Sequence, residues 1–259
     1  IKKFRSENAI IHSKNLLDKL NIQMDYGAIP QEFPIDEKRN IENIDFSEIL
    51  LQKAKEKSKI ILTGEPGSGK SWMIDNFKNY LITQDIKVVR HLCYTDLKDE
   101  YGGERIKLNV FYGNLIKDIL NEFPELSKYK ERKYASDLSE LNLLIKEIKE
   151  QTIIIVDGLD HINRIFTDTD YTRQDVDIIN HIKKIVLSPY VKIVLASQPI
   201  HELEDFEDFY GMTIPPWNIE QVLEYIRKID FVDLELDEDE YKLSDFLYET
   251  SNGNPLYLN

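Results

Sequence analysis

The chain has 259 residues, of which 42% are hydrophobic and 31% charged, a composition typical of a folded globular protein with a sizeable core. Its 47 acidic residues outnumber the 33 Lys and Arg, and the net charge of −14 disfavours direct nucleic-acid binding, because such binding needs basic residues against phosphates. The apolar runs are far shorter than the roughly 20 residues of a membrane span. The single cysteine, Cys93, excludes an intrachain disulfide and fits a reducing cytoplasm.

The two ends of the sequence suggest that it is part of a longer polypeptide. It starts at Ile1 rather than at Met, and residues 253–259 stop directly after a turn that leads into apolar residues. The start also lacks the basic and apolar regions of a signal peptide. We expect both ends to be boundaries inside a longer chain.

Hydrophobic spacing predicts the elements in chain order. Residues 7–20 have a weak helical spacing, and turn signals at Gly27, Pro30 and Pro34 follow. Beyond these turns, apolar residues on one helical face predict helices, and short runs rich in β-branched residues predict strands. The predicted helices are 45–57, 72–83, 108–122, 137–150, 175–187, 218–228 and 241–250, and the predicted strands are 59–63, 87–93, 152–156 and 191–196.

The alternation of strands and helices predicts an α/β fold. Right-handed crossovers would produce a mainly parallel sheet between two layers of helices. After Pro199 the predicted strands stop and only helices remain, so we expect a domain boundary near residue 210.

A glycine-rich segment between the first predicted strand and the next helix matches G-x-x-x-x-G-K-[ST] in full. It consists of Gly64, Glu65, Pro66, Gly67, Ser68, Gly69, Lys70 and Ser71, and Trp72 follows. The glycines let backbone N–H groups turn toward a phosphate, and the helix start adds its positive end. Lys70 is expected to contact the β- and γ-phosphates, and Ser71 to provide a hydroxyl ligand for Mg²⁺. The segment, with Trp72, therefore predicts the nucleotide site of a P-loop NTPase.

An acidic residue ends the strand 152–156. Asp157 stands where a P-loop enzyme places a carboxylate beside its metal, so we expect Asp157 and Ser71 to hold Mg²⁺. No Glu follows Asp157 directly, and the nearest acid, Asp160, is the candidate to position or activate the attacking water. The predicted catalytic residues are Lys70, Asp157 and Asp160. No Asn/Thr-Lys-x-Asp guanine motif is present, which favours ATP over GTP.

Residues 61–71 and 155–160 together resemble the STAND class of signal-transducing P-loop ATPases, and its NACHT branch in particular. At the end of the strand 191–196 the family has Ser-Arg-Pro, and here Gln198 replaces the arginine that senses the γ-phosphate. The segment Gly253-Asn254-Pro255 resembles the family's Gly-x-Pro motif. The resemblance thus implies nucleotide contacts at Gln198 and Pro255.

The family resemblance also implies an organisation and a role. We expect an N-terminal linker or extension in residues 1–44, a P-loop NTPase core in residues 45–210 and an incomplete helical lid in residues 211–259. Such a chain would bind ATP or ADP, hydrolyse ATP slowly, and control self-association and effector activation. Effector and sensor domains would lie on the same longer polypeptide, as in bacterial antiviral (anti-phage) members.

Two alternatives from other classes stay open. One is an AAA+-type ATPase acting on DNA, against which Gly158 and the negative charge argue. The other is a small-molecule kinase.

Overall fold

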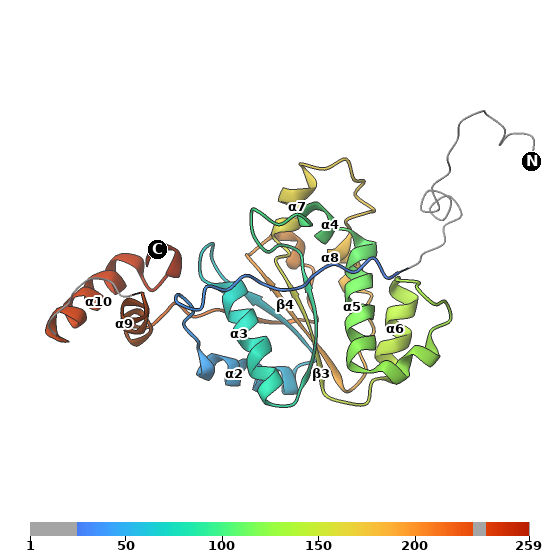
Figure 1. The fold of residues 1–259 in the computed structure, drawn as a ribbon, viewed down its shortest axis with the longest axis horizontal. Helices are drawn as coiled ribbons and strands as arrows, with labels where there is room; N and C mark the ends of the chain where they lie inside the picture. Colours follow the sequence, from blue (N-terminus) through green and yellow to red (C-terminus); the bar gives the residue numbers. More distant parts are fainter. Residues whose placement is uncertain (1–24, 230–236, 259) are drawn as a thin grey trace, which may run out of the picture.

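The computed structural model describes residues 25–229 and 237–258, so the predicted helix 7–20 lies outside the described residues. One parallel sheet forms the centre (Figure 1), and its strands have the order β2-β3-β4-β1-β5. The strands are β1 (Lys59–Thr63), β2 (Lys87–Leu92), β3 (Thr152–Asp157), β4 (Val191–Ser197) and β5 (Tyr210–Thr213). The predicted α/β fold with a parallel sheet is confirmed.

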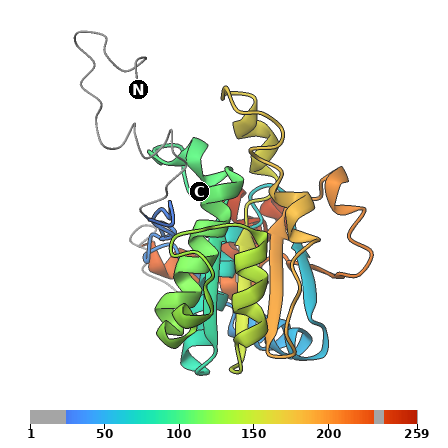
Figure 2. The same cartoon turned by 90° about the vertical axis from the view of Figure 1, so that its right-hand side faces the viewer.

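Helices cover both faces of this sheet. Helices α2 (Ile44–Glu56) and α3 (Lys70–Thr83) lie on one face, and α5 (Leu108–Glu122) and α6 (Leu138–Glu147) lie on the other, in front of the strands in Figure 2. Helices α9 (Ile219–Lys228) and α10 (Asp237–Ser251) lie together beside the α2–α3 layer, at the left of Figure 1. The remaining helical segments are α4 (Gly102–Arg105), η2 (Pro124–Tyr129), α7 (His161–Phe166), α8 (Ile178–Ile182), η3 (His201–Leu203) and η4 (Pro255–Leu258). No helix in the described part of the chain is long and apolar enough to cross a membrane.

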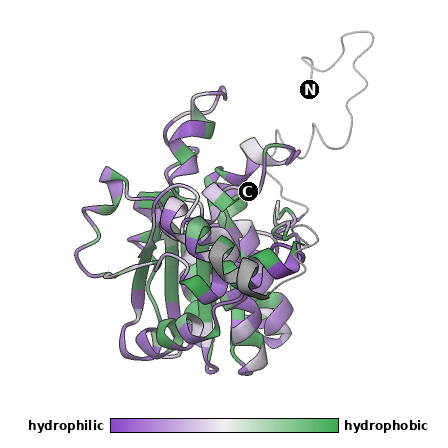
Figure 3. Cartoon of the chain, turned by 90° about the vertical axis from the view of Figure 1, so that its left-hand side faces the viewer, coloured by the Kyte–Doolittle hydropathy of each residue, from purple (hydrophilic) through white to green (hydrophobic). Residues whose placement is uncertain are grey.

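Strand β3 shows why the sheet is buried on both faces. Successive side chains of a strand point to opposite faces. Ile153 and Ile155 therefore belong to the apolar cluster that includes Leu50 of α2 and Phe77 of α3. Ile154 and Val156 belong to the other cluster, with side chains of α5 and α6. Strand β3 accordingly has four apolar residues in a row, and Figure 3 shows hydrophobic stretches on the strands of the sheet, as a sheet covered on both sides requires.

The fifth strand is absent from the sequence-based prediction, which has only helices after Pro199. Strand β5 pairs with β1, and three of its four residues are exposed. Without an apolar run it carries no pattern typical of a buried strand, and pairing along β1 determines its conformation. The sheet thus extends past residue 210, where the sequence places the domain boundary. The division into core and lid stays a prediction.

Two further differences concern the segment after β3. The predicted helix 175–187 is reduced to α8. Its later start follows a turn in which the Thr172 N–H and hydroxyl both donate to Asp175 Oδ2, at 2.8 and 2.7 Å. Helix α7 was not predicted, and its six residues are too few for a periodic signal.

Residues 25–43, which we call the strap, run across α5 and α3 (Figure 1) and contact the carboxyl end of the edge strand β2. An edge strand has unpaired backbone groups, and the strap pairs one of them. The Leu92 N–H donates to Gln31 Oε1 at 2.7 Å. Arg105 Nη1 donates to the Pro30 carbonyl at 2.9 Å, and the Ile29 N–H donates to Asn114 Oδ1 at 2.8 Å. The strap is thus joined to β2, α4 and α5.

The imidazole of His91 in β2 gives the fold a specific pH dependence. It is fully buried, with Nε2 2.9 Å from the Arg105 carbonyl oxygen and Nδ1 2.9 Å from Asn114 Nδ2. Burial lowers the pKa of His91 to about 3, so the folded chain keeps it neutral while an unfolded chain takes up a proton below about pH 6.5.

We therefore expect the His91 contribution to stability to be lost as the pH falls below its unfolded pKa. The loss in unfolding free energy from this residue should be about 1 kcal/mol per pH unit between about pH 6 and about pH 4. Urea denaturation of the wild type and of His91→Gln measures it, because the variant lacks this titration. Equal slopes of stability against pH in the two proteins would contradict the assignment.

Candidate functional site

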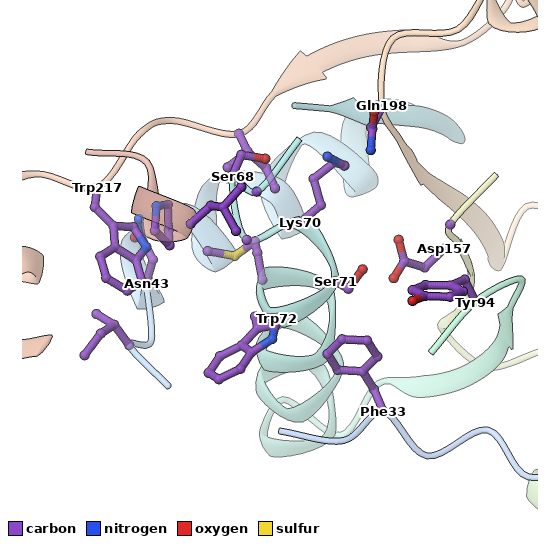
Figure 4. A pocket seen from close by; sticks show the side chains of 18 of the residues that line it. Phe33, Asn43, Ser68, Lys70, Ser71, Trp72, Tyr94, Asp157, Gln198 and Trp217 are labelled. Carbon is purple, nitrogen blue, oxygen red and sulfur yellow. The ribbon is translucent and has the colours of Figure 1, made fainter. Parts of the chain in front are cut away.

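A pocket of about 360 Å³ lies at the carboxyl ends of β3 and β4, beside the start of α3 (Figure 4). The carboxyl edge of a parallel sheet is where such folds bind ligands. The structure brings most of the predicted site residues together around this pocket. Those that line it are Gly67, Ser68, Gly69, Lys70, Ser71, Trp72, Asp157, Asp160, Gln198 and Pro255. Those that do not line it are Gly64, Glu65 and Pro66.

The glycine-rich loop joins β1 to α3. Gly67 and Gly69 have φ values of +77° and +81°, a region that favours glycine. Gly69 directly precedes α3, so the loop reaches the helix N-terminus without a side chain at this turn. Lys70 Nζ donates to the carbonyls of Gly64 and Glu65 at 2.7 and 3.0 Å. These two residues, which do not line the pocket, therefore contribute by holding the lysine.

The charge of Lys70 is balanced by acids across the pocket. Burial lowers the pKa of Lys70, and the charges of Asp160, Asp157 and Glu65 act in the opposite direction. A partly desolvated ammonium group beside a loop of backbone N–H groups is suited to a phosphate, because the site presents positive charge in a region of reduced dielectric.

Asp157 ends β3 and is 1% exposed. Its Oδ2 atom is buried and has no hydrogen-bond partner. Burial raises the pKa of Asp157 to about 6, although a hydrogen bond donated by Ser71 lowers it. A buried carboxylate oxygen without a partner is costly, and a divalent cation would satisfy it. The Asp157 and Ser71 oxygens are ligand types that Mg²⁺ prefers.

No group of three or more His, Cys, Asp or Glu residues in residues 25–229 and 237–258 could hold a metal ion. Asp157 and Ser71 alone do not complete an octahedral shell. A Mg²⁺ ion at this position would therefore take its other ligands from water and from a bound phosphate. This is the usual arrangement for Mg²⁺ at phosphate sites.

The carboxylate of Asp160 is in contact with the end of β4. Its Oδ1 atom accepts from the Gln198 N–H at 3.0 Å and from Ser197 Oγ at 3.4 Å. Its Oδ2 atom lies 3.4 Å from His161 Nε2, and the His161 ring stacks on Tyr94 with centroids 4.0 Å apart. Burial lowers the pKa of His161. The loop after β3 is thereby joined to β4 at the pocket wall.

Several pocket residues were missed by the sequence-based reasoning. The strap and the N-cap of α2 contribute Phe33, Arg39, Ile41 and Asn43, the segment after β2 contributes Tyr94 and Thr95, and the region around α9 contributes Ile214, Pro215, Trp217 and Tyr225. Most are apolar or aromatic, and Figure 4 shows Trp217 on the opposite side of Lys70 from Asp157, with Tyr94 beside Asp157. No spacing motif could have found them.

The segment 253–256 lies against the glycine-rich loop. The Leu256 N–H donates to the Gly67 carbonyl at 3.3 Å, and Asn254 Nδ2 donates to the Pro66 carbonyl at 3.2 Å. The contact is close: a Cβ atom on Gly67 would lie 2.3 Å from Leu256 Cβ. The Trp217 N–H also donates to the Gly253 carbonyl at 2.8 Å. The segment thus links the loop to the chain that leads into α9.

A family model described as "Nephrocystin 3, N-terminal" matches residues 40–198. The match spans more than half of the chain and includes the glycine-rich loop, Asp157 and Gln198, and the chain belongs to this family. A comparison with curated proteins gives no significant match.

Solved structures show the fold. The Walker-type ATPase of Pyrococcus abyssi has a TM-score of 0.54 and 17% identity, covering 87% of this chain and 67% of its own. The ORC2 protein of Aeropyrum pernix has a TM-score of 0.49 and 11% identity, and the match covers 88% of this chain and 61% of the ORC2 chain. A STAND protein with a tetratricopeptide repeat sensor from Pyrococcus horikoshii has a TM-score of 0.46 and 16% identity, and the match covers 88% of this chain and 31% of the STAND protein. The predicted P-loop NTPase fold is confirmed, and this chain spans under a third of that STAND protein.

The unpartnered Asp157 carboxylate predicts a stability cost in the metal-free protein. Its folded pKa of about 6 lies above the ordinary 3.8, so ionisation above about pH 6 destabilises the fold. We expect Asp157→Asn to raise the unfolding free energy by on the order of 2 kcal/mol at about pH 7.5. At about pH 4.5 the difference should shrink, because the folded wild type is then protonated.

Calorimetric Tm values without nucleotide or divalent ions test this expectation. Asp205→Asn, at an exposed carboxylate outside the pocket, is the control. A variant Tm below that of the wild type at about pH 7.5 would contradict the cost assigned to Asp157.

Proposed function

We propose that this chain is the ATP- and ADP-binding module of a longer STAND-type signalling protein, and that it hydrolyses ATP slowly with Mg²⁺. The observation that carries the proposal is one pocket lined by the glycine-rich loop, the Lys70 ammonium and the unpartnered oxygen of Asp157. A pocket of about 360 Å³ is within the range of small-molecule sites.

Each part of the loop has a role in this proposal. Backbone N–H groups and the α3 N-terminus would cradle the phosphates, and Lys70 would exchange its carbonyl partners, Gly64 and Glu65, for phosphate oxygens. Ser71 and Asp157 would hold Mg²⁺, which neutralises charge on the phosphates when bound. Hydrolysis would be slow because Gly158 follows Asp157 where a water-activating Glu would otherwise stand.

The apolar part of the pocket is suited to the nucleobase. Phe33, Trp72 and Trp217 line it, and flat aromatic side chains can contact the face of a purine (Figure 4). Pro255 and Leu256 close the pocket beside Gly67. The proposal therefore places the base between the strap and residues near α9, and the phosphates at the loop.

The contact between residues 253–256 and the glycine-rich loop supports a switch. If ADP stabilises this closed arrangement and ATP favours an open one, the difference in affinity shifts the population. The proposed organisation is the extension 1–44, the core 45–210 and the lid 211–259. Opening would permit self-association and effector activation, with effector and sensor on the same longer polypeptide. We place this protein in the cytoplasm, in antiviral defence.

Removal of the lysine tests the site. We expect Lys70→Ala to weaken binding of a fluorescent ADP or ATP analogue by at least about 100-fold, because a charged contact to phosphate is lost. Asp157→Ala should abolish Mg²⁺-dependent hydrolysis. Lys149→Ala, outside the pocket, is the control for the loss of a lysine. An unchanged Kd in Lys70→Ala would contradict the site, and turnover strongly stimulated by DNA would favour the AAA+ alternative.

Phe33 tests the proposed base subsite separately from the phosphates. We expect Phe33→Ala to raise the Kd of ATP and of ADP by a similar factor of about tenfold, since stacking on a base contributes about 1–3 kcal/mol. Inorganic pyrophosphate binding should not change. Tyr190→Ala removes an exposed aromatic side chain at the start of β4, the end of the sheet opposite the pocket. If Phe33→Ala behaves like this control, the base does not contact the strap.

A further inference from the structure

The carboxylate of Asp160 makes its hydrogen bonds within the protein, through Oδ1. The side chain is 8% exposed, Oδ1 accepts from the Gln198 N–H and Ser197 Oγ, and Oδ2 faces His161 Nε2. A general base needs an oxygen within hydrogen-bond reach of the attacking water. The geometry of Asp160 instead favours a role in holding the end of β4 in position.

The group that Asp160 holds lies just past the end of strand pairing. The register of β3 and β4 ends with Asp157 opposite Ala196, and the Gly158 N–H still donates to the Ala196 carbonyl at 3.1 Å. Beyond Ser197 the chain leaves the sheet and reaches Pro199, which has no N–H. The Gln198 N–H therefore has no strand partner, and Asp160 accepts its hydrogen bond. This contact continues the link between the two strands into the pocket wall.

The position that this bond fixes is functional in the proposed site. Gln198 lines the pocket together with Lys70 and Asp157 (Figure 4). Ser197 is fully buried at the end of β4, and this burial holds the chain in place directly before Gln198. The negative charge of Asp160 also acts on Lys70, whose pKa it raises against the effect of burial. Asp160 thus sits behind the pocket wall and acts on groups that face the phosphate end.

We propose that Asp160 is a positioning residue, whose carboxylate holds the Gln198 backbone and so places the Gln198 side chain against the terminal phosphate. This role rests on the proposed nucleotide function and replaces proton transfer from water as the task of Asp160. His161 supports it from the other side, because its ring is held by the stack on Tyr94. The amide of Gln198 would donate to phosphate oxygens without carrying a charge.

Two substitutions at Asp160 distinguish positioning from proton transfer. Asp160→Asn keeps an oxygen that can accept from the Gln198 N–H but cannot serve as a base, so kcat should stay within about threefold of wild type. Asp160→Ala removes the acceptor, and kcat should fall by at least about tenfold. The ADP Kd should stay within about twofold in both variants, because ADP lacks the terminal phosphate. Circular dichroism and Tm confirm that each variant is folded.

Gln198→Ala completes the test. The measured quantity is the Kd for a slowly hydrolysed ATP analogue divided by the Kd for ADP. Asp160→Ala and Gln198→Ala should raise this ratio by a similar factor. The double variant should raise it little further, because each single change already removes the same contact between Gln198 and the terminal phosphate. This ratio does not require turnover. Additive effects, or an Asp160→Asn variant as inactive as Asp160→Ala, would overturn the positioning role. A wild-type chain that binds neither nucleotide would overturn the proposed function itself, before any variant is made.

Discussion

The site depends on one constraint of the fold, namely that all five strands run in the same direction. Parallel strands bring their carboxyl ends to a single edge, so Thr63, Asp157 and Ser197 end neighbouring strands although they are far apart in the sequence. The loop that leaves β1 and the acid that ends β3 therefore face the same pocket. Burial on both faces keeps this edge in place, because the central strands β1, β3 and β4 contribute side chains to the apolar clusters on both faces.

Charge at this edge is held at a cost to the fold. Asp157 has a buried oxygen without a partner, and Lys70 is partly desolvated beside two aspartates. Such groups are typical of functional sites, where a ligand supplies the missing interactions. Asp160 differs from Asp157 in this respect, since its Oδ1 atom accepts two hydrogen bonds within the chain. Asp157 and Asp160 are three residues apart and differ in their hydrogen bonds, which is why we propose different tasks for them.

The other walls of the pocket come from segments outside the central sheet. The strap brings Phe33 to the pocket after attaching to β2 through Gln31, and residues 253–256 attach to the glycine-rich loop through backbone contacts. Each attachment is a hydrogen bond to a backbone group that is not paired within the sheet or the loop, namely the Leu92 N–H in β2 and the Gly67 carbonyl in the glycine-rich loop. A nucleotide in this pocket would contact the sheet, the strap and the C-terminal segment together. Its binding would therefore be coupled to the arrangement of all three.

The sequence by itself determined the parts of the protein that local patterns encode. The glycine-rich loop needs a fixed spacing of small residues, and the buried strands need continuous apolar runs, so the loop, Asp157 and the parallel sheet were predictable from residues 59–196. Only the tertiary structure decided the rest. Strand β5 is mostly exposed and exists through its pairing with β1, and Phe33 and Trp217 meet in one pocket through long-range packing. The partners of Asp160 were equally hidden, because no local pattern records which backbone N–H lies within reach of a carboxylate.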